Sequence, residues 1–163
     1  MKYAIVYASQ TGNTRLLAQT VQDCLPAEDL MYFGEASENA LEADRIYVGF
    51  WTDKGTCVSK TAEFLKTLSG QQVFLFGTAG FGGEPAYFEK ILEKTRKHLA
   101  PSVQVVGSYL CQGKMPMSVR ERYEKMQKAH MPVPNLKAMI ENFDRALSHP
   151  DQADLDGLKA QIR

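Results

Sequence analysis

Hydrophobic residues along this chain form two patterns that alternate. One is a short continuous apolar run, and the other is a longer segment in which apolar residues have helical spacing. The apolar runs cover residues 2–8, 30–33, 45–50, 73–76 and 103–109. Each has the length of a strand, and the run at 73–76 is apolar throughout, which is typical of a strand covered on both faces. The run at 30–33 is the weakest of the five. The pattern therefore predicts five strands.

Between these runs, apolar residues recur every three or four positions, as they do in amphipathic helices. Pro85 suits the first turn of a helix, where its missing N–H costs nothing. Ser118 and Glu121 match a capping box. Three predicted helices begin at Asn13, Pro85 and Ser118. Two others cover residues 56–68 and 136–147, the latter after Pro132 and Pro134, and a short last one covers 155–162.

Strands that alternate with helices predict a parallel sheet with helices on both faces, because βαβ crossovers are right-handed. We therefore expect an α/β fold, a doubly wound three-layer sandwich around a five-stranded parallel sheet. The length of 163 residues suits one domain over 1–149, with 150–163 as a helical tail packed on it. In such sheets ligands bind beyond the carboxyl ends of the strands, so the loops after strands one, three and four should form the site.

Charge and composition narrow the classes of partner. Lysine plus arginine equal aspartate plus glutamate at 19 each, so net charge attracts neither nucleic acid nor anionic lipid. No apolar run approaches the roughly 20 residues that cross a bilayer, and no signal peptide is visible, which favours a cytoplasmic protein without a membrane partner. Cys24, Cys57 and Cys111 form no CxxC pair and the histidines have no ligand spacing, so we expect reduced thiols and no metal.

The most informative stretch follows the first strand, where three hydroxyl residues surround one glycine at the start of a helix. Hydroxyl groups, a close-approaching glycine backbone and the unpaired N–H groups of a first helical turn together can hold a phosphate. An ordinary Thr-Gly turn with an N-cap is the alternative. The GxxxxGK[ST] loop of nucleotide triphosphatases is absent. The candidate phosphate residues are Ser9, Gln10, Thr11, Gly12, Asn13 and Thr14.

Residues 9–14 resemble the T/S-x-T-G-x-T phosphate loop of the flavodoxin family, at the same place after strand one. By element order the resemblance covers roughly residues 2–147. It implies FMN as the cofactor, strand order 2-1-3-4-5, and a phosphate held by residues 9–14. Flavodoxins are themselves the reference case for binding at this switch point of the sheet.

Two further loops match the family's flavin-ring loops. Trp51 stands where flavodoxins place an aromatic ring against the isoalloxazine, although it could instead plug the sheet edge. Gly55 could allow the backbone rearrangement seen in the family. The outer stacking residue is left open between Phe81 and Tyr87, and Tyr87 could equally face the core. The cofactor candidates in these loops are Phe50, Trp51, Thr52, Asp53, Lys54, Gly55, Thr78, Ala79, Gly80, Phe81, Gly82 and Gly83.

The chain departs from typical flavodoxins, which are acidic, in being neutral overall. If Lys54 and Lys114 lie near the flavin, their charge would make its potential less negative, whereas solvated surface lysines would have no effect. Methionines at 115, 117, 126, 131 and 139 could serve partner docking or fill the core.

The resemblance implies an electron shuttle without catalytic residues of its own, fed by a flavin reductase or a ferredoxin-type donor and serving a reductase-type acceptor. An NAD(P)H-dependent FMN or quinone oxidoreductase of the same fold is the alternative, although no dinucleotide fingerprint is visible. A response-regulator receiver domain of the same fold is disfavoured, because Ala8 and Ser9 stand after the first strand where such a domain has the acidic pair that holds magnesium. Segments 49–57 and 111–115 also resemble a bacterial flavodoxin-like subfamily that accompanies bilirubin reductases, which implies a tetrapyrrole-reducing partner.

Overall fold

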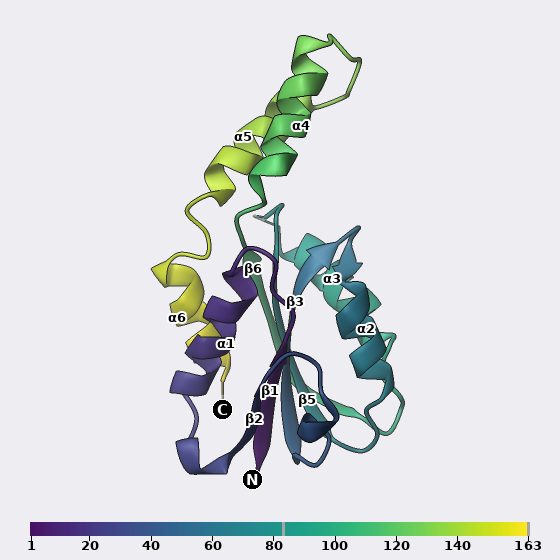
Figure 1. Ribbon diagram of the computed structural model, residues 1–163, viewed down its shortest axis with the longest axis vertical. Helices are drawn as coiled ribbons and strands as arrows, with labels where there is room; N and C mark the ends of the chain where they lie inside the picture. Colours follow the sequence, from purple (N-terminus) through teal and green to yellow (C-terminus); the bar gives the residue numbers. More distant parts are fainter. Residues whose placement is uncertain (83, 163) are drawn as a thin grey trace.

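A parallel sheet of five strands runs through the centre of the molecule, in the order β2-β1-β3-β5-β6. The structure is a computed structural model that describes residues 1–82 and 84–162 (Figure 1). This order is the flavodoxin-like 2-1-3-4-5, so the predicted fold class is confirmed. The strands are β1 Tyr3–Tyr7, β2 Leu30–Gly34, β3 Arg45–Asp53, β5 Gln72–Ala79 and β6 Gln104–Gln112.

Helices cover both faces of this sheet and make the sandwich three layers thick (Figure 1). On one face lie α1 (Asn13–Asp23) and α6 (Gln152–Gln161), and on the other lie α2 (Ser59–Lys66) and α3 (Pro85–Arg96). Short 3-10 turns, η1 (Ala27–Asp29) and η2 (Glu38–Ala40), flank β2. The link from β2 to β3 thus contains a single helical turn where the other crossovers contain full helices.

Alternation along the strands divides the core into two clusters. Ile5, Tyr47 and Phe76 pack toward α1 and α6. Val48 and Leu75 pack with the residues of α2 and α3 on the opposite face. Because both faces are buried, β5 needs apolar side chains at nearly every position, which explains its continuous apolar run.

Two strands extend further toward the carboxyl edge than the apolar runs predict. β3 continues to Asp53 and turns back through Lys54 and Gly55 into β4 (Thr56–Cys57), which pairs antiparallel with it. Lys54 and Gly55 have φ of 54° and 81°, as a two-residue hairpin turn requires. The predictions that the strand ends at 50 and that the helix begins at 56 are therefore wrong. β5 likewise extends to Ala79.

Two helices after β6 leave the sandwich and form a hairpin beyond the carboxyl edge of the sheet (Figure 1). They are α4 (Met117–Lys128) and α5 (Leu136–Ala146). Helix α4 begins directly after Pro116 and has no side-chain cap, so the capping box predicted at Ser118 is wrong. The helix starts earlier than that pattern assumes, which places Ser118 inside its first turn.

Helix α6 returns to the sandwich and completes the layer that contains α1. Leu158 is fully buried in the cluster under α1. The Tyr109 hydroxyl donates to the Asp154 carbonyl at 2.8 Å, and burial raises the pKa of Tyr109 to about 12. A Cβ at Gly157 would lie 2.5 Å from the Tyr109 hydroxyl, so only glycine permits this approach. Asp151 and Asp154 form the capping box of α6.

We predict that Leu158→Ala lowers the free energy of unfolding by about 2–5 kcal/mol, because it opens a cavity between α6, α1 and the sheet. Leu147→Ala is the matched control: this leucine is 48% exposed, and its loss should change stability by less than about 0.5 kcal/mol. Urea unfolding followed by circular dichroism measures both. If the two substitutions lowered the free energy of unfolding equally, α6 would not be part of the hydrophobic core.

Candidate functional site

The loop between β1 and α1 presents an uncapped helix start. Gly12 precedes α1 with φ of 89° and no side chain caps the helix. Thr14, in the first turn, is fully buried, and its Oγ1 has no hydrogen-bond partner among the described residues. A buried hydroxyl without a partner costs about 1–3 kcal/mol, so this atom points to a ligand that would accept its hydrogen bond. An anion at the positive end of α1 fits that requirement.

Three other polar side chains of this loop, those of Ser9, Thr11 and Asn13, already make hydrogen bonds within the protein. The Asn13 amide donates to the Lys114 carbonyl at 2.9 Å, and the Thr11 hydroxyl donates to the same oxygen at 3.4 Å. The Ser9 hydroxyl accepts a long hydrogen bond of 3.4 Å from the Arg15 N–H. For Asn13 in particular, the group left to contact an anion is its main-chain N–H.

The end of β3 places Trp51 beside this loop. Trp51 is paired with Thr78 in the sheet, is half-buried, and lines a cavity together with Ser9 and Gln10. The Thr52 hydroxyl donates to the Thr78 carbonyl at 2.9 Å, which ties the two strand ends together. Phe50 is fully buried in the core, so only its main chain could meet a ligand.

The β3–β4 turn carries cations that the sequence located only in part. Asp53 and Lys54 are exposed at this turn. A Cβ at Gly55 would lie 3.6 Å from Nζ of Lys94, which α3 contributes from a distant part of the chain. Lys94 therefore joins Lys54 at the turn. No sequence signal marked Lys94, because its proximity depends on how α3 packs.

The loop after β5, called here the ring loop, consists of Gly80, Phe81 and Gly82 among the described residues. Phe81 is 41% exposed, whereas Thr78 and Ala79 are buried at the strand end. Gly83, the remaining candidate, lies outside the described residues. Tyr87 packs with Phe88 against the core cluster under α3 at a ring distance of 6.0 Å, and burial raises its pKa. Tyr87 thus faces the core, and Phe81 is the exposed aromatic residue of the ring loop.

Side chains from outside the ring loop hold it in place. The Gly80 carbonyl accepts hydrogen bonds from the Gln112 amide at 2.9 Å and from the Asn142 amide of α5 at 3.0 Å. The Gln112 amide also donates to the Asn142 Oδ1 at 3.1 Å. A Cβ at Gly80 would lie 2.6 Å from the Met115 side chain, so a larger residue would require that side chain to move. Neither Gln112 nor Asn142 was recognised from the sequence, because their role depends on the path of the hairpin.

The segment 112–115, called here the strap, connects the loops at this edge. The Gly113 N–H donates to the Ala79 carbonyl at 2.9 Å, and the Lys114 N–H donates to the His149 carbonyl at 3.0 Å. A Cβ at Gly113 would lie 2.4 Å from the Asn13 amide nitrogen, which explains the glycine. The Lys114 side chain is exposed and lines a hollow of about 300 Å³ beside the phosphate loop.

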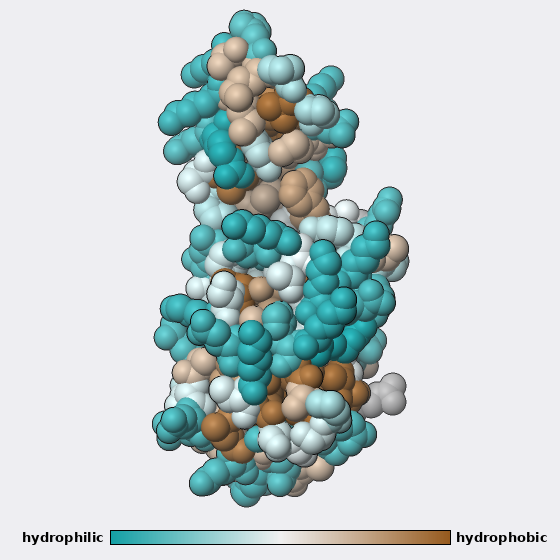
Figure 2. All heavy atoms as spheres, turned by 90° about the vertical axis from the view of Figure 1, so that its right-hand side faces the viewer, coloured by the Kyte–Doolittle hydropathy of each residue, from teal (hydrophilic) through white to brown (hydrophobic). Residues whose placement is uncertain are grey.

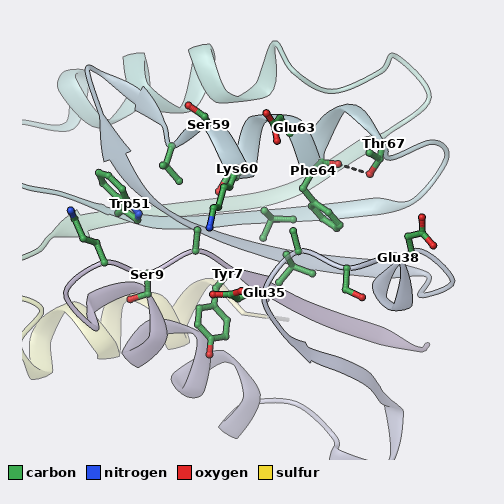
Figure 3. Close-up of a pocket in the computed structure, with 18 of the residues that line it drawn as sticks. Tyr7, Ser9, Glu35, Glu38, Trp51, Ser59, Lys60, Glu63, Phe64 and Thr67 are labelled. Atoms are coloured by element: carbon green, nitrogen blue, oxygen red, sulfur yellow. Dashed lines mark hydrogen bonds between the residues drawn. The ribbon is translucent and has the colours of Figure 1, made fainter.

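A larger cavity of about 810 Å³ opens at Ser9 and Trp51 and continues between α2 and residues 35–41 (Figure 3). Its deep part is apolar, with Val6, Val48 and Phe64. Lys60 extends from α2 into the cavity in Figure 3. Three carboxylates share the lining with this single cation, which makes the cavity negative on balance. They are Glu35, Glu38 and Glu63.

Remaining reactive groups lie apart from this edge or are held by structural contacts. Burial raises the pKa of the Cys57 and Cys111 thiols, so neither is an activated thiolate. His149, Asp151 and Asp154 bring their ligand atoms within 4.8 Å of one another, where the two carboxylates also cap α6. Over residues 1–82 and 84–162, no helix is both long and apolar enough to span a membrane.

Comparison with known proteins relates this geometry to one family. The model of the family described as the flavodoxin domain matches residues 4–163. The flavodoxin-like domain-containing protein BilS of Clostridium symbiosum is 40% identical over 172 aligned residues, covering 95% of this chain and 90% of that protein. BilS of Clostridioides difficile is 29% identical with the same coverage.

Solved structures show the same fold at low identity. A Streptococcus pneumoniae flavodoxin superimposes with a TM-score of 0.55 at 20% identity, covering 89% of this chain and 99% of its own. A Lactobacillus acidophilus flavoprotein in complex with FMN gives a TM-score of 0.52 at 15% identity, covering 76% of this chain and 98% of its own.

We predict that Asn142→Ala loosens the ring loop, because the Gly80 carbonyl loses a donor and the Gln112 amide loses an acceptor. The free energy of unfolding should fall by about 1–3 kcal/mol, and hydrogen exchange at the amides of Phe81 and Gly82 should accelerate. Gln127→Ala, on the exposed surface of α4, is the control and should change neither. Unchanged exchange at the ring loop in Asn142→Ala would contradict this anchoring role.

Proposed function

The chain belongs to the flavodoxin domain family, and on that premise we propose that it binds FMN at the carboxyl edge of the sheet and passes electrons between partner proteins. Flavodoxins are FMN-binding electron carriers. The observation that best supports FMN here is the buried Thr14 hydroxyl without a partner at the uncapped start of α1. That atom and the first-turn N–H groups match the needs of a phosphate dianion without a lysine.

The same arrangement offers places for the rest of the cofactor. Trp51 and the ring loop lie at the carboxyl ends of the adjacent strands β3 and β5, where a flat ring system would enter. We propose that Trp51 supplies a stacking face, worth about 0.5–1.5 kcal/mol beyond apolar burial. The N–H groups of Gly80, Phe81 and Gly82 would meet the polar edge of the ring, since the Gly80 carbonyl is already engaged.

When bound, FMN supplies the redox chemistry, because its ring system accepts and releases electrons. The chain's own residues bind and orient it. Residues 9–14 anchor the phosphate, Trp51 excludes water from one face, and the strap fixes the spacing between the two loops. Phe81 is exposed beside this space, where an aromatic side chain could cover part of the ring and still leave an edge open to a partner.

We further propose that a reductase or ferredoxin-type protein donates electrons and that a tetrapyrrole-reducing enzyme accepts them. Segments 49–57 and 111–115 support this acceptor through their resemblance to proteins that accompany bilirubin reductases. The negative charge of the large cavity supports the proposal that the tetrapyrrole is bound by another protein and not by this chain. Bilirubin is a dicarboxylate, and a lining of three glutamates with one lysine disfavours its binding here.

A test of the FMN site compares two buried threonines of α1. Thr14→Val removes the hydroxyl without a partner and should raise the dissociation constant for FMN about 10- to 100-fold, the value of a hydrogen bond to a charged group. The apoprotein should lose no stability, because the hydroxyl has no protein partner. Thr20→Val is the control, since the Thr20 hydroxyl donates to the Leu16 carbonyl at 2.9 Å. Calorimetric titration with FMN measures both.

Riboflavin, which lacks the phosphate, should bind wild-type protein far more weakly than FMN and should not distinguish the two variants. A Thr14→Val variant with wild-type FMN affinity would refute the phosphate assignment. A folded wild-type protein that is colourless and gives no heat with FMN would refute the proposed function as a whole.

An NAD(P)H-dependent oxidoreductase is the second candidate, and the 810 Å³ cavity next to Trp51 is the observation that favours it, because a carrier needs no substrate cavity. Its acidic lining opposes an anionic nucleotide. We therefore expect NADH or NADPH, added without air to the FMN-loaded protein, to leave the visible flavin absorbance unchanged over minutes. Rapid bleaching by either nucleotide would favour the oxidoreductase over the carrier.

A further inference from the structure

The α4–α5 hairpin has an apolar side that its two helices cannot cover alone. The helices pack chiefly against each other, and Tyr123 is the buried residue of α4. Met117 and Met131 are 58% and 50% exposed. Figure 2 shows brown and tan atoms along the middle of the hairpin, surrounded by hydrophilic atoms. The apolar residues of the hairpin that are only half-buried are Val119, Met126, Val133, Leu136, Met139 and Ile140.

Charge is distributed unevenly along the same hairpin. Near its base, Arg120 pairs with Glu124 and Asp144, each at 3.3 Å. Farther out, residues 125–140 contain Lys125, Lys128 and Lys137 but no aspartate or glutamate. Because the whole chain is neutral, this distal half carries a formal charge of +3 against −3 for the remainder. The tip of the hairpin is therefore a distinct basic surface.

The position of the hairpin relates this surface to the site. It rises from the edge of the sheet where the phosphate loop and the ring loop lie (Figure 1). Its 12-residue helix α4 is about 18 Å long, and its base is bonded to the Gly80 carbonyl through Asn142. A protein that approaches the flavin edge would therefore lie in the corner between the sheet edge and the hairpin.

We propose that the distal half of the α4–α5 hairpin, residues 125–140, is a docking surface for an acidic patch on a ferredoxin-type electron donor. This inference rests on the proposed function. An apolar centre with a charged rim is the usual composition of a protein interface. Three lysines on a neutral chain would neutralise few phosphates, which favours a protein over nucleic acid as the occupant. Opposite charges would steer the partner toward the flavin edge and raise the association rate.

The test uses the FMN-loaded full chain and a plant-type [2Fe–2S] ferredoxin, an acidic one-electron donor, as the probe. The arm variant carries Lys125→Glu, Lys128→Glu and Lys137→Glu. The control variant carries Lys66→Glu, Lys90→Glu and Lys97→Glu, which changes the net charge equally at exposed positions in α2, in α3 and directly after α3. Stopped-flow mixing gives the second-order rate of flavin reduction, and biolayer interferometry on immobilised ferredoxin gives the affinity.

At low ionic strength, where the Debye length reaches about 30 Å at 0.01 M, we expect the arm variant to lose at least tenfold in rate and in affinity. The control variant should stay within about twofold of wild type in both measurements, since its charges lie away from the docking surface. Raising the salt should slow wild type and leave the arm variant little changed. Equal losses in both triple variants, or no loss in the arm variant, would overturn the proposal.

Two further measurements separate the possible causes of failure. The first measures binding of wild type and of the arm variant to a single-stranded DNA oligonucleotide and to phosphatidylserine vesicles. If wild type binds either of them more tightly than ferredoxin, and the arm variant does not bind it, then nucleic acid or membrane is the ligand of this surface and the proposal is overturned. FMN titration of both variants should match wild type. Absence of FMN binding in wild type would refute the proposed function, whereas normal FMN binding with unaltered ferredoxin kinetics would refute the docking surface alone.

Discussion

The strap at residues 112–115 is the constraint on which the carboxyl edge of this protein depends. Its carbonyl and N–H groups bond to the phosphate loop through Asn13, to β5 through Ala79 and to the segment before α6 through His149. Two glycines, Gly80 and Gly113, permit the close contacts that these bonds require. Parts of the chain about 100 residues apart are thereby held in one arrangement at the carboxyl edge of the sheet.

Both backbone and side-chain groups contribute charge at this edge of the sheet. The start of α1 contributes positive potential without a lysine. Lys94 places its Nζ beside Gly55 in the β3–β4 turn that also contains Lys54, and Lys114 lines the hollow beside residues 11–13. The carboxylates gather instead in the cavity under α2. A neutral chain can therefore bind an anionic cofactor and still separate regions of opposite sign that different partners would recognise.

The base and the distal half of the α4–α5 hairpin have different roles. Its base is structural, because Asn142 is nearly buried and bonded to the ring loop. Its distal half keeps its three lysines and Met131 exposed, whereas Met126 and Met139 are half-buried. The two helices pack against each other, and the base of the pair contacts the ring loop through Asn142. The site and the surface that would receive a partner are thus physically continuous.

The sequence alone determined the fold class, because apolar periodicity is a local property of the chain. The hydroxyl-glycine motif at residues 9–14 is equally local, and from it the sequence predicts a phosphate loop. Local patterns also predicted that Trp51 lies at the carboxyl end of the third strand, although they ended β3 before Trp51 instead of at Asp53 and misplaced the cap of α4. Only the tertiary structure brought Lys94 to the β3–β4 turn, turned the Phe50 side chain into the core, and joined Gln112 and Asn142 to Gly80. Those contacts connect residues far apart in the chain, and their distances depend on how helices and strands pack in three dimensions.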